Sequence, residues 1–469
     1  MRGCRVLFSI TFWVTFVPCV SISIFTIYYL VYSGYYSSID LFTSKKSIHL
    51  SHLYDYDTST VTKDCMITPQ IQLLNYPPTY TFINKNPINV LREILSEKSW
   101  IYIDPKLKQS QLLSFLNRID LILTHPTAYV LHKTAKIFSQ LRDDGTQYIN
   151  CIDRMYNVTG NKYVQRRVME DFASSNGCFL DSLGIMPKTF LLGELNECKS
   201  FFRYSKRVTN SWILKPYSGE GGDGITVHSD VSSLKNKFDC KVSKKYLVQE
   251  YIKPLLLDGR KFDVRAYFLI ARTDPFLVFY HHGYLRLSLK KFEMNTDIAT
   301  HLVNTHVQSK HRGYKNIAHK HMWTFKEFQD YLTANELVGK NWVEMVLEKF
   351  LKRVAVYIFN SGIDLYARRR GSFQLVGLDC LVDDKFRPWF TEANNYPLWI
   401  ESIPEDVHNV SANLGRDMLD LVFMLHQDPP AHPLYPGYSY GGWKLLYNQQ
   451  VQRCNPDHSP YQPCHDFHS

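Results

Sequence analysis

The stretch that decides the fold is GLDCLVDDKFRPWFTEANNYPLW, residues 377–399. Two apolar runs flank a short polar segment, which predicts two strands joined by a tight turn. The first run carries Asp379, and the second carries Glu392 and Asn394. Because strand side chains alternate between two faces, Glu392 and Asn394 share one face, and Asp379 meets them from the preceding strand. Three oxygen-bearing side chains in an apolar hairpin favour a hard divalent cation such as Mg²⁺; the alternative is an exposed polar hairpin face.

A glycine-rich loop lies upstream in WILKPYSGEGGDGI, residues 212–225. The predicted strand ends at Lys215 and Pro216, and four glycines follow: Gly219, Gly221, Gly222 and Gly224. Such a loop lets backbone N–H groups approach phosphate oxygens, and Lys215 adds a cation at its mouth. The spacing matches neither a Walker A loop nor the G-x-G-x-x-G of dinucleotide folds. A glycine-rich hairpin turn without a ligand is the alternative.

The third charged element is YLVQEYIKPLLLDGRKFDVRAYFLI, residues 246–270. Lys261, Asp263 and Arg265 alternate along a predicted strand, so they share one face. Two cations beside a carboxylate suit phosphate and metal, or a carboxylate substrate. The alternative is a solvated edge strand with cross-strand ion pairs, which the very apolar neighbouring residues disfavour.

These segments, with HLVN at 301–304, resemble the tubulin–tyrosine ligase-like family in their order and approximate separations, over about residues 150–425. The resemblance implies an ATP-grasp fold and an ATP-dependent carboxylate–amine ligase. Such an enzyme couples a free amino acid to a protein through an acyl-phosphate. It also implies ATP and Mg²⁺ as cofactors and an acceptor with an acidic tail, tubulin being the usual substrate of the family.

The resemblance assigns roles to individual residues. Lys215 binds the ATP phosphates beside Gly221 and Gly222, while Arg265 and Arg286 hold phosphate or the acceptor carboxylate. The remaining nucleotide-binding positions are Lys162, Gln249, Glu250, Tyr251, Ile252, Lys261, Asp263 and Asn304. Of these, Gln249 to Ile252 line the adenine pocket, Asn304 lies by the ribose and metal, and Lys162 is the upstream nucleotide-binding lysine. The Mg²⁺ ligands are Asp379, Glu392 and Asn394.

Four residues depart from the family pattern. Glu220 and Asp223 make the glycine loop acidic, Val303 replaces a threonine in HLVN, and Cys380 replaces a bulky apolar residue. An acidic loop motivates a competing hypothesis: a membrane-anchored binding protein of the secretory pathway that keeps the fold without the catalysis. Under the ligase hypothesis, glutamate, glycine and tyrosine all remain open as the transferred amino acid.

The order of apolar periodicities predicts an α+β fold, with antiparallel-rich sheets flanked by helices rather than a regular βαβ winding. Hydrophobic residues make up 45% of the chain and charged residues 21%, a composition that excludes wholesale disorder. The predicted helices are 88–97, 108–123, 162–175, 323–332, 342–361 and 412–426. The predicted divisions are an N-terminal segment 1–40, a stalk 41–80, an N-terminal lobe 81–190, a central ATP-grasp lobe 191–290, a C-terminal ATP-grasp lobe with the metal site 291–430, and a tail 431–469.

The N-terminus reads as a transmembrane helix that anchors the chain through residues 6–32. No charged residue occurs between Val6 and Ile39, which is long enough to span a bilayer. Arg2 and Arg5 precede this run, so the positive-inside rule places the catalytic domain in the lumen; a tubulin-modifying enzyme would require the cytoplasm. A cleaved signal peptide and an artefactual extension are the alternatives.

The remaining composition bears on partners and on the cysteines. The net charge of +10 permits an acidic partner, but the chain has no nucleic-acid motif or basic tail, so nucleic acid is not an expected partner. CNPDHSPYQPC, residues 454–464, has the form of a small disulfide loop in an oxidising compartment, and reduced cysteines are equally compatible with the sequence.

Overall fold

The computed structural model describes the part of the chain that contains the predicted site. The described residues are 81–84, 89–103, 119–123, 141–142, 144–219, 221–235, 238, 240, 245–294, 297–310, 312, 314, 321–395, 397, 405–427, 430, 434–435, 437–454 and 464–468. All of them belong to one of the two units into which the chain divides, Ile48–Ser469.

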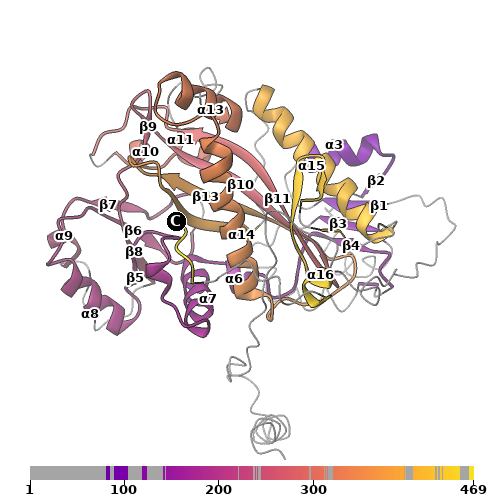
Figure 1. Cartoon of the computed structure of the whole chain (residues 1–469), viewed down its shortest axis with the longest axis horizontal. Coiled ribbons are helices and arrows are strands. Elements are labelled where there is room, and N and C mark those ends of the chain that lie inside the picture. Colours follow the sequence, from indigo (N-terminus) through magenta and orange to yellow (C-terminus); the bar gives the residue numbers. More distant parts are fainter. Residues whose placement is uncertain are drawn as a thin grey trace, which may run out of the picture. The chain divides into compact units, whose positions relative to one another are not determined.

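The predicted hairpin forms the edge of an eight-stranded sheet (Figure 1). Its path is β14 (Pro388–Asn395), β13 (Gln374–Val382), β10 (Arg260–Thr273), β11 (Phe276–Leu287), β16 (Trp443–Asn448) and β15 (Ser439–Tyr440). Two short strands join it, β12 (Met322–Thr324) beside β11 and β9 (Leu256–Leu257) beside β10. Every pairing is antiparallel, which confirms the antiparallel character predicted for this part of the chain.

Both faces of this sheet are buried, which explains why its strands are so continuously apolar. On β10, Val264, Ala266, Phe268 and Ile270 belong to a core shared with α14 (Lys349–Gly362), which follows the π-helical turn η6 (Val343–Glu348). Tyr267, Leu269 and Ala271 point the other way into a core shared with α15 (Glu405–Gln427). Figure 1 shows α14 and α15 beside β10 and β11.

A second sheet of four antiparallel strands carries the glycine loop. Its order is β5 (Thr189–Leu191), β8 (Tyr246–Glu250), β6 (Trp212–Pro216) and β7 (Thr226–His228). Helices α8 (Leu195–Tyr204) and α9 (Ser232–Lys235) accompany it, and Trp212 and Phe201 lie fully buried in its own core. A disulfide between Cys198 and Cys240 ties α8 to the residues after α9.

The third sheet is parallel, which the sequence did not predict. Its order is β2 (Ile101–Ile103), β1 (Thr81–Asn84), β3 (Leu121–Leu123) and β4 (Tyr148–Ile149), and α3 (Asn89–Glu97) connects β1 to β2. The helix predicted at 108–123 is wrong at its end, because Leu121–Leu123 form a fully buried strand. Three consecutive apolar residues fit a buried strand as well as a helix, and periodicity alone does not separate them.

The remaining helices are mostly short. They are α6 (Tyr156–Thr159), α7 (Lys162–Ser175), η4 (Leu180–Ser182), α10 (Ile298–His301), α11 (Thr305–Gln308), α13 (Phe325–Ala334) and α16 (Gln449–Cys454). Helix α7 has the predicted bounds because the Asn161 side chain accepts a hydrogen bond from Val164 N at the helix start. Its residues Val168, Met169 and Ala173 recur at helical spacing and are buried.

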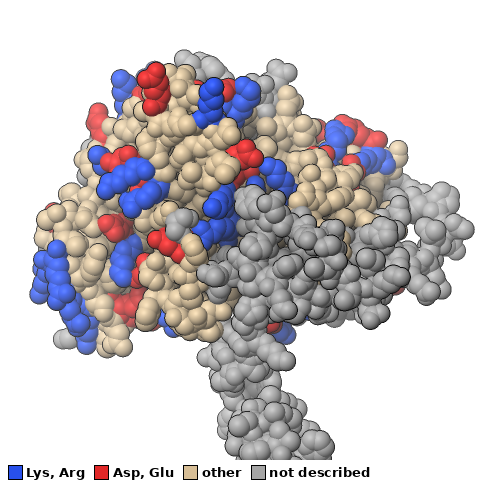
Figure 2. Space-filling view, viewed as in Figure 1, with Lys and Arg blue, Asp and Glu red and all other residues tan. Residues whose placement is uncertain are grey.

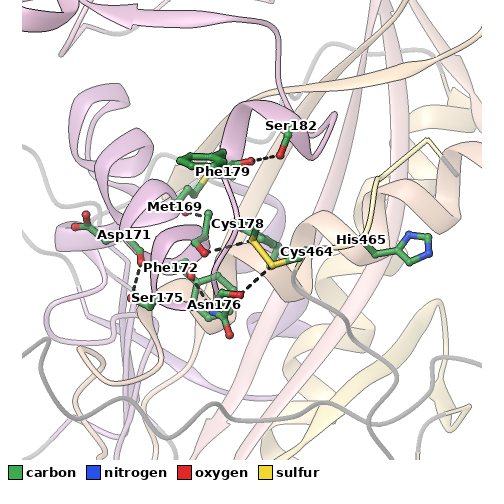
Figure 3. Close-up of a disulfide and its surroundings, with 12 residues drawn as sticks. Met169, Asp171, Phe172, Ser175, Asn176, Cys178, Phe179, Ser182, Cys464 and His465 are labelled. Carbon is green, nitrogen blue, oxygen red and sulfur yellow. Dashed lines mark hydrogen bonds between the residues drawn. A yellow bond between two sulfur atoms is a disulfide. The ribbon is translucent and has the colours of Figure 1, made fainter.

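Of the two states that the sequence left open for residues 454–464, the small disulfide loop is not the one in the structure. Cys464 instead bonds to Cys178, three residues beyond the end of α7, with their Cα atoms 5.5 Å apart (Figure 3). The two cysteines are 286 residues apart in the sequence, so spacing gave no indication of this pair. The bond attaches the C-terminal residues to the helix that begins with Lys162.

The expected single-pass membrane protein is also corrected. Among the residues that the structure describes, no helix is long and apolar enough to cross a membrane. The membrane localisation and the membrane partner are therefore withdrawn. Residues 6–32, like the whole of the predicted segments 1–40 and 41–80, lie outside the described residues, and the predicted lobe boundaries stay predictions.

Candidate functional site

The hairpin brings the three predicted metal ligands together. Asp379 on β13 lies directly opposite Glu392 on β14, and Asn394 follows two residues later on the same face. Asn394 Nδ2 donates to Asp379 Oδ2 at 3.0 Å and to Glu392 Oε1 at 3.5 Å. The predicted convergence of these side chains is therefore present in the fold, while their role as metal ligands remains a prediction.

Two arginines from neighbouring strands surround Asp379. Arg265 is paired with Asp379 in the β10–β13 register, and its Nε lies 2.6 Å from Asp379 Oδ1. Arg286, on β11, donates two hydrogen bonds to Asp263, at 2.8 and 2.7 Å, and its Nη2 lies 3.1 Å from Asp379 Oδ1. Burial raises the pKa of the Asp263 carboxyl, and the positive charge of Arg286 opposes that shift. The alternation read from the sequence thus produces a buried ion-pair network, not a solvated edge.

Glu392 is held from the opposite side by helix α7. Lys162 is the first residue of this helix, and its Nζ lies 2.9 Å from Glu392 Oε2. Burial alone would raise the pKa of Glu392, but the charge and hydrogen bond of Lys162, with the charges of Lys215 and Arg265, lower it to about 2. Glu392 in turn raises the pKa of Lys162. The carboxylate is therefore ionised at every physiological pH.

Lys215 reaches the cluster from the four-stranded sheet. Its Nζ donates to Gln249 Oε1 at 2.8 Å, and Gln249 Nε2 donates to Thr189 Oγ1 at 2.9 Å. Lys215 is buried, and burial lowers its pKa to about 8. A buried ammonium whose hydrogen-bond partner is a neutral amide is poised to interact with an anion.

Lys261 is a second buried lysine whose hydrogen-bond partner is neutral. Its Nζ donates to Tyr251 Oη at 3.1 Å and lies 4.7 Å from the centre of the Tyr251 ring. Tyr251 Oη lies 2.8 Å from His301 Nδ1, which links the HLVN segment to the lysine. Burial lowers the pKa of Lys261 to about 7. The sequence signal for His301 was its place in HLVN, but no role was assigned to it from the sequence.

The glycine loop packs against α11 and the residue before it. Gly221 and Gly222 have φ values of +65° and +88°, in the left-handed region that favours glycine. A Cβ on Gly222 would lie 2.6 Å from Leu302 Cδ1, and a Cβ on Gly221 would lie 2.7 Å from His306 Cδ2. Asn304 caps α11 by accepting from Val307 N at 3.0 Å. The close packing of the loop against Leu302 and His306 therefore explains why glycine occupies both positions, whether or not the loop also contacts phosphate.

The two remaining predicted residues are Glu250 and Ile252. Glu250 Oε1 accepts a hydrogen bond from Asn210 Nδ2 at 2.6 Å, and burial raises the Glu250 pKa. Tyr251 N, part of the predicted adenine pocket, donates to Ser211 O at 2.9 Å. Ile252 is partly exposed. These contacts connect β8 to the start of β6 and leave the adenine assignment a prediction.

The donor set fits a hard cation through its chemistry. In the described part of the chain, no three His, Cys, Asp or Glu residues group together as a metal site, so the set consists of two carboxylates and the Asn394 amide. Asp379 Oδ1 is buried and makes ionic contacts with the arginines but no hydrogen bond. Mg²⁺ commonly uses one or two carboxylates and completes its shell with phosphate oxygens and water, which such a set permits.

Cations outnumber carboxylates in this cluster. Among the described residues, three carboxylates (Asp263, Asp379 and Glu392) face five cations: Lys162, Lys215, Lys261, Arg265 and Arg286. On the molecular face shown in Figure 2, by contrast, Lys and Arg alternate with Asp and Glu. A buried surplus of positive charge is typical of proteins that handle phosphate and carboxylate groups.

Comparison with known proteins identifies the family. Residues 139–431 match the tubulin-tyrosine ligase family, and the chain belongs to that family. Protein polyglycylase TTLL10 of Macaca fascicularis is 32% identical over 287 residues, which cover 56% of this chain and 46% of the relative. Inactive polyglycylase TTLL10 of Homo sapiens is 29% identical over 324 residues, covering 59% and 48%. Tubulin monoglycylase TTLL3 of Mus musculus is 31% identical over 254 residues, covering 51% and 26%. The chain thus spans less than half the length of these relatives.

Proposed function

We propose that this chain is an ATP-dependent ligase that joins an amino acid, glycine in the first instance, to a carboxylate of a protein acceptor. The observation that carries the proposal is the buried cluster in which five cations face three carboxylates at the junction of two sheets. This cluster lies wholly within the residues that match the tubulin-tyrosine ligase family. The acceptor is an acidic protein segment, with tubulin the first candidate because of the names of several relatives.

The proposed reaction has two steps. The acceptor carboxylate oxygen attacks the γ-phosphorus of ATP, and the bond from this phosphorus to the β–γ bridging oxygen breaks. ADP departs, and the acceptor now carries an acyl-phosphate. The amine of the amino acid then attacks the acyl carbon, the bond to phosphate breaks, and the amine loses a proton as the amide forms. Positioning and charge neutralisation provide most of the acceleration in such transfers.

The described side chains divide these tasks. Lys215 and Lys261 hold the nucleotide phosphates, and Lys162 keeps Glu392 ionised and oriented. Arg265 and Arg286 present their charges to the acceptor carboxylate or the transferred phosphoryl group. Asp379, Glu392 and Asn394 would hold Mg²⁺, which supplies further charge stabilisation at the phosphates when bound.

Glycine is the preferred amino acid because three of the relatives above are named for glycine addition, whether active or inactive. The geometry is compatible with this choice. Arg265 and Arg286 are already paired with aspartates, and these pairs do not require a side-chain carboxylate on the incoming amino acid. Glutamate and tyrosine are the competing substrates in the test.

The test uses the full chain with Mg-ATP, glutamate-rich acceptor peptides and each of glycine, glutamate and tyrosine in turn. Mass spectrometry of the acceptor detects the added residue, and coupled ADP release reports turnover. We expect glycine addition that depends on both ATP and acceptor. Addition of glutamate or tyrosine alone would overturn the amino-acid assignment, and no ADP release with any acceptor would overturn the ligase.

A second candidate function is a binding protein that has lost turnover. The relative in Homo sapiens named an inactive polyglycylase favours it. The acidic glycine loop gives the same indication, although Glu220 lies outside the described residues and Asp223 is exposed. Mg-ATP binding by calorimetry without any ADP release would support this function over the ligase.

A further inference from the structure

The outer edge of β14 is covered in part by one amide side chain; farther along the strand, Phe390 N donates to Ile185 O at 2.8 Å. β14 is the terminal strand of the eight-stranded sheet, so its outer backbone groups have no neighbouring strand. Gln165, on α7, occupies that position. Ala393 N donates to Gln165 Oε1 at 3.1 Å, and Gln165 Nε2 donates to Ala393 O at 3.4 Å. The carboxamide therefore bonds both edge groups of one residue, as the backbone of another strand would.

Ala393 is the residue between Glu392 and Asn394. Its own side chain points into the core on the opposite face and is 5% exposed. Gln165 is 4% exposed, so both sides of this contact are shielded from water. One peptide unit joins Ala393 to Glu392 and another joins it to Asn394, so rotation of the Ala393 backbone would move both side chains together.

Two further contacts follow the same edge. Lys162, one helical turn before Gln165, bonds Glu392 at 2.9 Å, and the Thr159 hydroxyl donates to the Asn395 side chain. Residues 159, 162 and 165 thus contact strand residues 392, 393 and 395. The end of α6 and the start of α7 fix this strand over its last four residues.

We propose that Gln165 is a positioning residue that sets the spacing and direction of Glu392 and Asn394 toward Mg²⁺. This inference rests on the function proposed above, and it concerns metal affinity rather than nucleotide recognition. Residues that orient metal ligands without touching the metal typically change affinity by roughly 10- to 100-fold when altered. Without the two Gln165 hydrogen bonds, the buried N–H and C=O of Ala393 lack partners. We expect β14 to shift so that these groups reach water, which changes the positions of Glu392 and Asn394.

The chain offers a matched control in Gln374. This glutamine on β13 is also buried, at 1% exposed, and its Oε1 accepts from Ile152 N at 3.3 Å. Gln374 is the first residue of β13, five residues before Asp379, and its amide bonds to the backbone of Ile152. Gln374→Met removes the same kind of bond from the same sheet without touching β14.

The test measures Mg²⁺ dependence in three variants of the full chain, Gln165→Met, Gln165→Glu and Gln374→Met. Calorimetry gives the Mg²⁺ concentration for half-maximal binding at saturating ATP, and the affinity for ATP in EDTA. We expect Gln165→Met to raise the half-maximal Mg²⁺ concentration roughly tenfold while ATP affinity in EDTA changes less than about twofold. Gln165→Glu keeps the acceptor for Ala393 N–H and loses the donor, so we expect a smaller rise, about threefold.

The outcomes separate this inference from the function on which it rests. Gln374→Met should lower the melting temperature as much as Gln165→Met and leave the Mg²⁺ dependence unchanged. Equal Mg²⁺ dependence in wild type and both Gln165 variants would overturn the positioning role while leaving the ligase intact. Should Gln165→Met not fold, the shift in Gln165→Glu decides. A wild-type chain that binds no Mg-ATP would overturn the proposed function and this inference with it.

Discussion

The two sheets that meet at the site hold their charges in different ways. In the eight-stranded sheet, Arg265 and Arg286 are paired with aspartates on neighbouring strands. In the four-stranded sheet, Lys215 has the neutral amide of Gln249 as its hydrogen-bond partner. The first arrangement is complete without a ligand, whereas the second keeps a buried cation at a desolvation cost that an anion offsets. We infer that the paired arginines of the large sheet supply a fixed frame, and that the small sheet with Lys215, together with Lys261 at the start of β10, responds to the nucleotide.

The largest expected effect comes from the carboxylates of the fixed frame. We expect Asp379→Asn and Glu392→Gln each to lower turnover by about 100-fold or more, because each removes charge where the phosphoryl group is transferred. Glu392→Gln also leaves Lys162 without its partly buried ionic partner. Steady-state ADP release with an acceptor peptide measures the loss.

Asp384→Asn is the control for these variants. Asp384 lies in the turn of the same hairpin, and its partner Lys253 is 81% exposed. Solvent screens this surface pair and it lies away from the charged cluster, so turnover should stay within about twofold of wild type. Full activity in both Asp379→Asn and Glu392→Gln would show that these residues are not metal ligands and that the large sheet is not the frame of the site.

The next effect concerns the responsive sheet. We expect Lys215→Met to weaken Mg-ATP binding roughly 10- to 100-fold, since a charge-assisted hydrogen bond to phosphate is lost from a buried site. The apo protein should be as stable as wild type or more stable, because a buried charge disappears. Calorimetric titration and thermal melting measure the two quantities.

Arg265→Met provides the contrasting variant. It removes one member of a paired network and leaves Asp379 buried beside a lost partner, so it should destabilise the apo protein. If Lys215→Met were the more destabilising of the two in the absence of ligand, the distinction between frame and responsive sheet would be wrong.

A smaller effect follows from the lysine pKa values, about 8 for Lys215 and about 7 for Lys261. Burial lowers both, so each loses its proton as pH rises through these values in the ligand-free protein. Bound phosphate favours the charged form and raises the pKa, so nucleotide binding takes up protons between about pH 7 and 9. We expect affinity to fall roughly tenfold from pH 7 to pH 8.

Calorimetry in buffers of different ionisation enthalpy counts the protons taken up. Lys215→Met should remove the part of the pH dependence near pH 8 and keep the part near pH 7. Proton release on binding at pH 8 would contradict the assigned direction of both shifts.

The smallest effect on turnover is expected from the disulfide of the responsive sheet. Cys198→Ser with Cys240→Ser removes a bond that closes a separation of 42 residues. We expect a loss of about 4 kcal/mol in stability and less than a twofold change in turnover at low temperature, because neither cysteine contacts the charged cluster. Chemical denaturation and peptide mapping under non-reducing conditions test the bond and its contribution.

Local patterns predicted most of the two antiparallel sheets. The runs around Trp212, Val264 and Leu378 are strands because alternation and β-branched content act over a few residues, and α7 follows its Asn161 cap. The convergence of Asp379, Glu392 and Asn394 was also predictable, since a hairpin fixes which residues lie opposite one another. Local order therefore determined the frame of the site.

Contacts between distant segments were not predictable in the same way. The hydrogen bonds between Gln165 and Ala393 join residues 228 apart in the sequence. The parallel sheet depends on short strands whose partners lie across a helix and intervening residues. The sequence around Gln165 does not indicate that this side chain is buried or that it bonds to Ala393, because the partner lies on a distant strand.

Cys380 gives this site a chemical reporter. Its thiol is fully buried beside Asp379, donates to Leu381 O, and has a pKa raised by burial. A thiol in that state reacts with alkylating reagents only when the surrounding strands separate. The rate of Cys380 alkylation therefore reports how often the hairpin opens, and Mg-ATP should slow it in proportion to the fraction of protein that it occupies.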